Sequence, residues 1–357
     1  MARKLMKGNE AIAEAAIQAG CTMFFGYPIT PQNELPEYMS RRLPETGGCF
    51  LQAESEVAAI NMVYGAAGAG ARVMTSSSSP GISLKQEGIS YIACAQLPCV
   101  IVNMVRGGPG LGGILPAQSD YFQATKGGGH GDYRMIVLAP ATLQEAAELM
   151  AQAFDLADFY RMPVMLMGDG MLGQIMEPVD LDAIGRSNMP LPEKDWAATG
   201  WDGKSRERAI INSLLIEAHV LEAHIRHLEE KYADIAEKHT QVALEKADDA
   251  QILVVAYGTT ARIAKAAVDQ ARAEGIRAGL VRPITLWPFP TEAIANLAAK
   301  DDVKGLLTVE MSSGQMVEDV RLAVNGAKPV RFFGRTGGVV PSAEEILDQL
   351  RAMNGGE

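Results

Sequence analysis

The sequence contains no long hydrophobic run, although 48% of its 357 residues are apolar. No stretch reaches the roughly 20 consecutive apolar residues that a membrane-spanning helix requires. The chain passes from a short basic start into polar sequence, without the apolar segment of a signal peptide. We therefore expect a cytoplasmic protein that does not associate with membranes.

Positive charge is also scarce. The chain has 43 acidic residues against 32 lysines and arginines, which gives a formal net charge of -11. This balance lacks the basic footprint that nucleic-acid-binding proteins present. An acidic surface is repelled by anionic membranes as well, so neither nucleic acid nor a membrane is an expected partner.

Cysteine is the third scarce feature. The four cysteines lie in apolar surroundings and form no Cys-x-x-Cys pair; they are Cys21, Cys49, Cys94 and Cys99. We expect buried free thiols in a reducing compartment. Because the spacing of metal ligands is absent, no metal or iron–sulfur site is expected within this chain.

The length of the chain exceeds one ordinary core and predicts more than one domain. In residues 1–185, short apolar runs alternate with alanine-rich stretches, which predicts an α/β fold with a mainly parallel sheet. The expected strands are Met23–Phe25, Cys49–Gln52, Arg72–Thr75, Cys99–Val105, Met135–Leu138 and Val164–Met167. The expected helices are Gly8–Ala19, Glu56–Ala69, Gly88–Ala95 and Thr142–Tyr160.

Residues 186–248 are expected to form a linker and a long charged helix. Apolar residues recur there at alternating spacings of three and four, which is a heptad seam. The seam consists of Ile211, Leu214, Ala218, Leu221, Ile225, Leu228, Tyr232 and Ile235. It pairs either with another chain or with this protein's own domains. A second, smaller parallel-sheet domain is expected over residues 249–357.

Two strand ends carry side chains suited to chemistry. After the first expected strand the chain turns at Gly26–Pro31, where two prolines flank Thr30. After the second, a small-residue helix opens with Glu54 and Glu56 near its first turn, where carboxylates interact favourably with the helix dipole. Ligands in open α/β sheets bind at the carboxyl ends of strands, so both ends are expected to face one crevice.

Each of these side chains also has a plainer interpretation. Thr30 alone is more often a turn residue ahead of a helix that Pro31 begins. Glu56 alone is a first-turn glutamate that stabilises its helix. The apolar residues Val57–Ile60 nevertheless favour a desolvated Glu56, which suits a carboxylate that accepts a proton or hydrogen bond from a heterocycle. Glu54 is its rival, and spacing does not choose between them.

Arg106 ends the strand Cys99–Val105 and precedes the glycine-rich stretch Gly107–Gly113. An arginine in this position can bind a carboxylate through two hydrogen bonds, although an exposed loop arginine is an equal alternative. Three of the glycines match the spacing of a dinucleotide fingerprint. Because Pro109 interrupts the match and no apolar helix follows, we reject a nicotinamide-dependent dehydrogenase.

Several segments together resemble the alpha subunits of 2-oxoacid:ferredoxin oxidoreductases, a family of thiamine diphosphate enzymes. The resemblance runs over most of the chain and is closest to the branched-chain type, which acts on 3-methyl-2-oxobutanoate. The segments are Gly26–Pro31, Gln52–Ala59, Ser79–Glu87, Arg106–Pro109, Gly128–Arg134, Arg282–Pro283 and Leu286–Pro290.

The resemblance implies a division of labour between subunits. Residues 1–185 would form the pyrimidine-binding domain for thiamine diphosphate, and residues 249–357 a domain like the carboxyl-terminal domain of transketolase. Gly168–Gly170 resembles the start of the motif for diphosphate and Mg²⁺ but lacks the later asparagine pair, so Asp169 is interpreted as a turn residue. A beta subunit would bind the diphosphate and Mg²⁺. Gamma and ferredoxin-like delta subunits, the latter with iron–sulfur clusters, would complete the complex.

The resemblance also implies roles for single residues. Glu56 would hydrogen-bond the aminopyrimidine ring of thiamine diphosphate and so assist proton removal from its thiazolium ring. Thr30 and Arg106 would hold the substrate carboxylate. Further cofactor contacts would come from Tyr27, Pro28 and Ile29. The implied reaction is oxidative decarboxylation of a 2-oxoacid with coenzyme A, which gives acyl-CoA, carbon dioxide and reduced ferredoxin.

Three questions stay open at the level of sequence. The substrate is alternatively 2-oxoglutarate or pyruvate, and a further cation that reaches a distal carboxylate would favour 2-oxoglutarate. The chain is alternatively a non-catalytic scaffold that binds a partner through the heptad seam. The polar turn Thr75–Ser79 and the loop around His130 either belong to the site or serve as a helix cap and a subunit contact.

Overall fold

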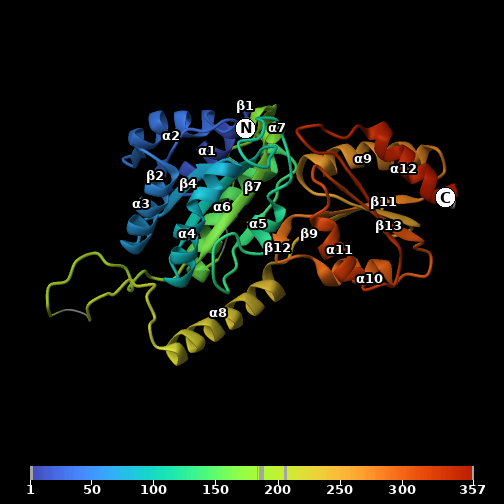
Figure 1. The fold of residues 1–357 in the computed structure, drawn as a ribbon. Helices are drawn as coiled ribbons and strands as arrows, with labels where there is room; N and C mark the ends of the chain where they lie inside the picture. Colours follow the sequence, from blue (N-terminus) through green and yellow to red (C-terminus); the bar gives the residue numbers. More distant parts are fainter. Residues whose placement is uncertain (1–2, 183, 185–188, 205–206, 356–357) are drawn as a thin grey trace.

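The structure, a computed structural model, describes residues 3–182, 184, 189–204 and 207–355. Within these ranges the chain forms two α/β units that lie side by side, with the helix α8 (Ala218–His239) beneath the first (Figure 1). Among the described residues, no helix combines the length and the apolar composition needed to cross a membrane.

The first unit is built on a seven-stranded sheet in the order β12-β6-β7-β5-β4-β2-β3. All strands from β2 to β7 pair in parallel. Their bounds are β2 (Met23–Gly26), β3 (Cys49–Gln52), β4 (Val73–Ser77), β5 (Cys99–Val105), β6 (Ile136–Leu138) and β7 (Pro163–Asp169). Every strand that the apolar runs predicted is therefore present, with small differences at the ends.

Helices cover both faces of this sheet (Figure 1). Those on the first face are α1 (Gly8–Gln18), α2 (Glu34–Glu45) and α6 (Leu143–Tyr160). Those on the second are α3 (Glu56–Gly68) and α4 (Ser79–Cys94). Successive strand residues alternate between the two cores, since Phe24 belongs to the first and Phe25 to the second. Two covered faces explain why the central strands β5 and β7 are buried along their whole length and mostly apolar.

The helix α4 begins at Ser79, well before the Gly88 start that the sequence predicted. Gly81 and Gly88 lower the intrinsic helix propensity of this stretch, which concealed its first turns. Packing explains their presence, because a Cβ on Gly88 would lie 2.6 Å from Ile60 of α3. The glycines thus let two helices approach closely on the second face of the sheet.

The second unit has a five-stranded sheet in the order β14-β13-β10-β11-β9. Its strands are β9 (Val242–Glu245), β10 (Ile252–Val255), β11 (Ala278–Pro283), β13 (Gly305–Glu310) and β14 (Val330–Gly334). Only β9 among them pairs antiparallel. The helices of this unit are α9 (Gly258–Ala273), α10 (Thr291–Ala298), α11 (Met316–Val324) and α12 (Ala343–Gly355).

Short elements link the two units and close the first. A two-stranded ribbon is formed by β1 (Lys4–Lys7) and β8 (Met176–Val179). The strand β12 (Thr285–Trp287) leaves the second unit and pairs antiparallel with β6 at the edge of the first sheet. Conversely, β9 lies within residues 186–248 yet pairs with β11. The domain boundary expected between residues 248 and 249 stays a prediction. The boundary expected between residues 185 and 186 lies outside the described residues.

The expected long helix is shorter than predicted. Because α8 begins at Ala218, the first two residues of the seam lie in irregular chain before it. The last part of the seam is buried in the core of the first unit, through Leu228, Tyr232 and Ile235. This part of the seam therefore packs against the protein's own chain.

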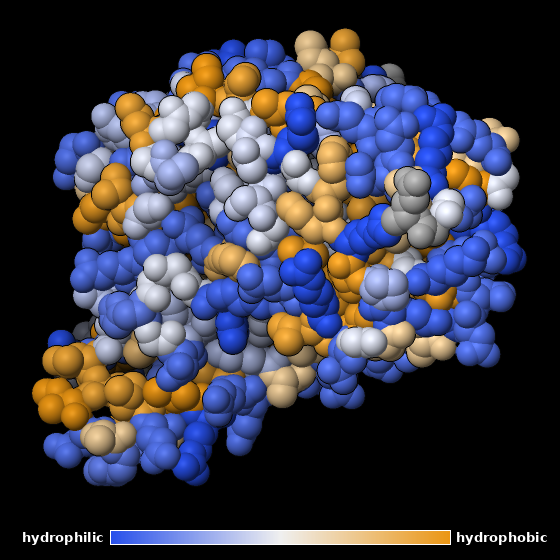
Figure 2. Space-filling model, turned by 45° about the vertical axis from the view of Figure 1, so that its right-hand side comes forward, coloured by the Kyte–Doolittle hydropathy of each residue, from blue (hydrophilic) through white to orange (hydrophobic). Residues whose placement is uncertain are grey.

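The chain that precedes α8 leaves apolar side chains in solvent. Ile210, Leu214 and Ile216 are exposed by 78%, 67% and 81%. Apolar surface gathers at the lower left of the face drawn in Figure 2, where this part of the chain projects. Large exposed apolar groups are typical of surfaces that bind a partner, so contact through this segment stays a prediction.

All four cysteines are free, as expected. Burial raises the pKa of the Cys21 and Cys99 thiols to about 12, which makes them poor nucleophiles. The expected burial of Cys49 is wrong, because this residue begins β3 at the edge of the sheet and is exposed.

Gln118 connects the two units. Its Oε1 accepts hydrogen bonds from Thr260 Oγ1 at 2.6 Å and from Met311 N at 3.0 Å. Its Nε2 donates to Tyr257 O at 2.9 Å, and the residue is 2% exposed. One buried amide thus satisfies three polar groups of the second unit and fixes that unit against the first.

We expect Gln118→Ala to lower the free energy of unfolding by about 3 kcal/mol, because each buried group that loses its partner costs ~1–3 kcal/mol. Denaturant unfolding of the purified protein measures this. The matched control is Gln270→Ala at an exposed position on α9, expected to change the free energy by less than about 0.5 kcal/mol. Equal losses in the two variants would contradict the role of Gln118.

Candidate functional site

The structure brings the predicted strand ends to one edge of the first sheet. β3 and β4 flank β2, and β5 lies beside β4. Thr30 follows β2, Glu56 opens the helix after β3, and Arg106 follows β5 directly. The carboxyl ends of neighbouring parallel strands therefore carry all three predicted catalytic side chains.

Glu56 is the first residue of α3, where Ser55 caps the helix by accepting a hydrogen bond from Ala58 N at 3.2 Å. The residue is 7% exposed, whereas its rival Glu54 is exposed. In the described part of the chain, the Glu56 carboxylate accepts no hydrogen bond and forms no ion pair. A buried carboxylate is costly without such partners, so this one is available to a ligand.

Gly81 in the first turn of α4 makes room for that carboxylate. A Cβ at this position would lie 2.7 Å from Glu56 Oε1 and 2.0 Å from Ser77 Oγ. The hydroxyls of Ser77 and Ser78 are buried and have no hydrogen-bond partner within the described ranges. Three polar side chains at the ends of β3 and β4 thus lack partners, which is the pattern of a site that a ligand completes.

Arg106 joins three segments of the site and is 6% exposed. Its Nη1 donates to Thr30 O at 2.9 Å, and its Nη2 donates to Leu111 O in the glycine-rich loop at 3.0 Å. Its backbone N donates to Ser79 Oγ at 3.0 Å. The Nε–H makes no hydrogen bond among the described residues, and each Nη has a second N–H. Donors for an anion therefore remain.

The turn that carries Thr30 is fixed through its neighbour Pro31. Asn9 Nδ2 and Gln174 Nε2 both donate to Pro31 O, at 2.9 and 3.0 Å. Thr30 lies in a turn, as its plainer interpretation expected, but α2 begins only at Glu34, so the expected helix start at Pro31 is wrong. The predicted cofactor contacts at this turn differ in exposure: Tyr27 and Pro28 are exposed and Ile29 is half-buried.

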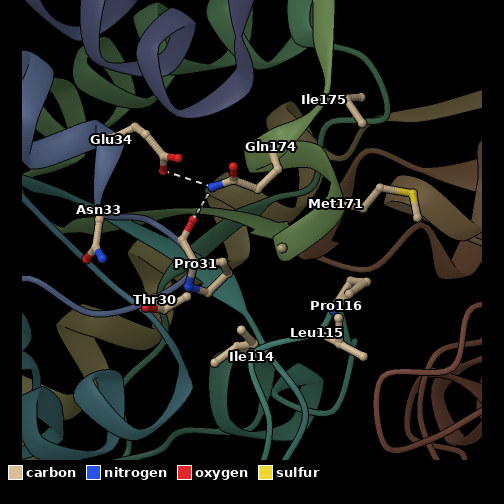
Figure 3. A pocket seen from close by; sticks show the side chains of 11 residues that line it. Thr30, Pro31, Asn33, Glu34, Ile114, Leu115, Pro116, Met171, Gln174 and Ile175 are labelled. Carbon is tan, nitrogen blue, oxygen red and sulfur yellow. Dashed lines mark hydrogen bonds between the residues drawn. The ribbon is translucent and has the colours of Figure 1, made fainter.

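A cavity of about 550 Å³ opens beside Thr30 (Figure 3). Its walls are the turn after β2, the end of the glycine-rich loop and the short helix α7 (Gly170–Gln174). The lining residues are Thr30, Pro31, Asn33, Glu34, Ile114, Leu115, Pro116, Gly170, Met171, Gln174 and Ile175. Most of these side chains are apolar.

Glu34 is the charged residue in this lining. Burial disfavours its charge, but hydrogen bonds from its own backbone amide and from three side chains outweigh burial and lower its pKa. One of these donors is Gln174 at 2.8 Å, as Figure 3 shows, and another is Lys7 at 3.3 Å. The described lining therefore contains one carboxylate, already paired with Lys7, and no cation.

Asp169 ends β7 and caps α7. Its Oδ1 accepts hydrogen bonds from Met171 N at 2.9 Å and from Leu172 N at 3.1 Å. Burial raises the pKa of this carboxyl, although a hydrogen bond with Thr259 of the second unit opposes the shift. Asp169 is thus a strand-end turn residue, as interpreted from the sequence. The described residues contain no cluster of three acidic, histidine or cysteine side chains that could hold a metal ion.

The loop that carries His130 lies elsewhere. Ser90 Oγ of α4 donates to His130 O at 2.7 Å, and the imidazole packs edge-on against Tyr91. With His224 of α8, these residues line a separate cavity of about 210 Å³. The structure therefore places His130 at the contact between α4 and α8 rather than with Thr30 and Arg106.

Lys85 is a polar residue near Glu56 that the sequence analysis did not select. It lies on α4 with an exposure of 0%, and its Nζ donates to Glu56 O at 3.4 Å. Its place between Gly81 and Gly88, at the spacing of one helix face, could have predicted contact with α3.

Comparison with known proteins shows which family models match this chain. A family model for the thiamine diphosphate-binding domain of pyruvate flavodoxin/ferredoxin oxidoreductases matches residues 14–243. A second model, for core domain II of pyruvate:ferredoxin oxidoreductase, matches residues 250–346. The first match spans the unit that carries Thr30, Glu56 and Arg106.

Individual relatives match the chain over its whole length. It is 48% identical over 355 residues to the ketoisovalerate oxidoreductase subunit VorB of Methanothermobacter thermautotrophicus, which covers 99% of both chains. It is 37% identical to the 2-oxoglutarate synthase subunit KorA of the same organism, over 98% of both chains. Among solved structures, the 2-oxoglutarate:ferredoxin oxidoreductase of Magnetococcus marinus superposes with a TM-score of 0.86 at 25% identity, over 98% of this chain and 65% of that one.

Proposed function

The chain belongs to the pyruvate flavodoxin/ferredoxin oxidoreductase family, and we propose on this basis that it is a catalytic subunit acting on a branched-chain 2-oxoacid. The reaction joins the 2-oxoacid and coenzyme A into acyl-CoA and carbon dioxide, and two electrons pass to ferredoxin. The thiamine-binding fold predicted from the sequence is confirmed by the family match.

The observation that carries the proposal is the unpartnered Glu56 carboxylate at the strand ends. It fits a ring nitrogen of thiamine diphosphate, because a buried carboxylate needs a hydrogen-bond donor. When bound, thiamine diphosphate supplies the electron sink for decarboxylation. Glu56 would bind its aminopyrimidine ring, and the exposed Tyr27 and Pro28 with Ile29 would contact it.

Arg106 and Thr30 would bind the substrate carboxylate. The first turn of α4 separates these two residues from Glu56. The guanidinium retains N–H donors, and a charge-assisted hydrogen bond from arginine is about twice as strong as a neutral one. Thr30 would add its hydroxyl. Because Arg106 also holds the Thr30 carbonyl at 2.9 Å, the two groups that would receive the carboxylate are fixed relative to each other.

The cavity beside Thr30 supports a branched aliphatic substrate. Its apolar walls suit an isopropyl group, and its one charged residue, Glu34, is already paired with Lys7, so the described lining offers no cation to the distal carboxylate of 2-oxoglutarate. Relatives named for ketoisovalerate, which is 3-methyl-2-oxobutanoate, are also more similar than those named for 2-oxoglutarate. We therefore rank 2-oxoglutarate and pyruvate below the branched-chain substrate.

Substrate preference of the purified complex tests this assignment. With coenzyme A and a viologen dye, kcat/KM is expected to be highest for 3-methyl-2-oxobutanoate. Ile114→Lys should raise the relative kcat/KM for 2-oxoglutarate about tenfold, since a new cation in the lining would attract the distal carboxylate. Ile114→Met, of similar length without charge, is the matched control. If both variants gave the same ratio of kcat/KM for the two substrates, the pocket for the substrate's side chain would lie elsewhere.

Partner subunits would supply the remaining groups. A beta subunit would bind the diphosphate and Mg²⁺, since Asp169 is engaged in capping α7. Gamma and ferredoxin-like delta subunits, with iron–sulfur clusters, would carry electrons to ferredoxin. A location in the cytoplasm, expected from the sequence, stays a prediction.

A non-catalytic scaffold is the second candidate. The exposed Ile210, Leu214 and Ile216 favour it, because they offer an apolar surface to a partner. The two functions differ in one outcome. A scaffold predicts that the complex still decarboxylates when Glu56, Thr30 and Arg106 are all replaced, whereas the catalytic assignment predicts an inactive complex.

A further inference from the structure

Lys85 is a fully buried ammonium group in the second turn of α4. Its one hydrogen bond among the described residues is long, from Nζ to Glu56 O at 3.4 Å. Burial lowers the pKa of Lys85 to about 8, and the negative charge of Glu56 opposes that shift. Burying a charged amine with a single weak partner destabilises a fold, so its presence calls for a reason other than packing.

The position of Lys85 is set by two glycines on the same helix face. Gly81 brings α4 within contact of the Glu56 carboxylate, where a Cβ would lie 2.7 Å from Oε1. Gly88 brings it within contact of Ile60 on α3, where a Cβ would lie 2.6 Å from the side chain. Lys85 lies between these two close approaches. Its side chain is therefore confined against the first turn of α3, where Glu56 begins the helix.

The charged surroundings of Lys85 are simple. From α3 it faces Glu56, the charged group that acts on it within the described ranges. Ser77 of β4 also lies beside Glu56, and its side chain is a neutral hydroxyl. At this contact between two helices, Lys85 binds the backbone carbonyl of Glu56 and, among the described residues, forms no ion pair with its carboxylate.

We propose that Lys85 is a positioning residue for Glu56: its buried ammonium binds the backbone carbonyl of Glu56 and so holds the first turn of α3 with the Glu56 carboxylate toward the aminopyrimidine ring of thiamine diphosphate. The inference rests on the proposed function, because it assigns Lys85 an effect through Glu56. Because the carbonyl that Lys85 binds belongs to Glu56 itself, fixing this carbonyl also fixes where the Glu56 side chain begins. Lys85 itself need not touch cofactor or substrate.

A structural lysine and a positioning lysine differ in what their removal does. Methionine has a similar length and no charge, so Lys85→Met removes the desolvation penalty while filling the space. The unfolding temperature of Lys85→Met is therefore expected to equal or exceed that of the wild type. Function, in contrast, should decline, as expected where a costly residue is kept for activity.

The experiment uses the purified complex with Lys85→Met. Removing the ammonium frees the first turn of α3, so kcat with 3-methyl-2-oxobutanoate at saturating thiamine diphosphate should fall about tenfold. The affinity for thiamine diphosphate at pH 6, measured by calorimetry after cofactor removal, should fall about tenfold. The matched control is Lys231→Met on α8, another lysine whose pKa burial lowers to about 8, and it should change neither quantity.

A double variant separates this inference from the proposed function. If Lys85 acts through Glu56, Lys85→Met causes no further loss of cofactor affinity once Glu56→Gln is present. An unchanged kcat and cofactor affinity in Lys85→Met would overturn the inference, as would a lowered unfolding temperature without a loss of cofactor affinity. In either case an inactive Glu56→Gln complex would leave the proposed function standing.

Discussion

Replacing Glu56 with glutamine is expected to abolish turnover while the complex stays assembled. Glutamine keeps the shape that fits against Gly81 but loses the charge and the basicity, and removing such a proton-transfer group costs about a hundredfold to ten-thousandfold in rate. Viologen reduction by the purified complex measures the loss, and size-exclusion chromatography measures assembly.

Glu54→Gln is the matched control for Glu56. It makes the same chemical change two residues earlier, at an exposed position, and should retain nearly full activity. A complex that carries Glu56→Gln and still turns over at a near-normal rate would refute the assignment. An inactive Glu54→Gln complex would transfer the role to the neighbouring carboxylate.

Arg106→Ala is expected to raise the KM for the 2-oxoacid far more than the KM for coenzyme A. A hydrogen bond to a charged group contributes about 1.5–3 kcal/mol, so kcat/KM for the 2-oxoacid should fall roughly tenfold to hundredfold. Thr30→Val removes the hydroxyl but keeps the carbonyl that Arg106 binds, and its effect should be a smaller rise in the same KM.

The control for Arg106 addresses its structural contacts. Arg106 also donates a hydrogen bond to the backbone carbonyl of Leu111 in the glycine-rich loop. A purely structural role of Arg106 would therefore raise the KM values for the 2-oxoacid and for coenzyme A alike. Arg262→Ala breaks an ion pair with Glu177 at the contact between the units, 2.6 Å long, and should leave both KM values unchanged. Equal rises in the two KM values of Arg106→Ala would argue against a carboxylate-binding role.

The strands and the edge that carries the site were predictable from the sequence, because local patterns determine them. Continuous apolar runs such as Cys99–Val105 mark buried parallel strands, and the carboxyl ends of such strands meet at one edge. Thr30, Glu56 and Arg106 could therefore be selected as candidates before their positions in space were known. Their chemical roles came from the family resemblance and remain predictions.

Features that depend on contacts distant in sequence were not predictable. Spacing could not separate Glu54 from Glu56, because only the packing of α4 at Gly81 buries one and leaves the other exposed. The burial of Lys85 depends on the same contact. The exchange of β12 into the first sheet likewise results from tertiary pairing, which a three-residue segment does not reveal by itself.

The most direct test is a structure of the assembled complex with thiamine diphosphate bound. We expect a Glu56 carboxylate oxygen at about 2.6–3.2 Å from a nitrogen of the aminopyrimidine ring, with the diphosphate held by a partner subunit. A cofactor found away from the start of α3, or bound entirely by residues of another subunit, would contradict the assignment of this site.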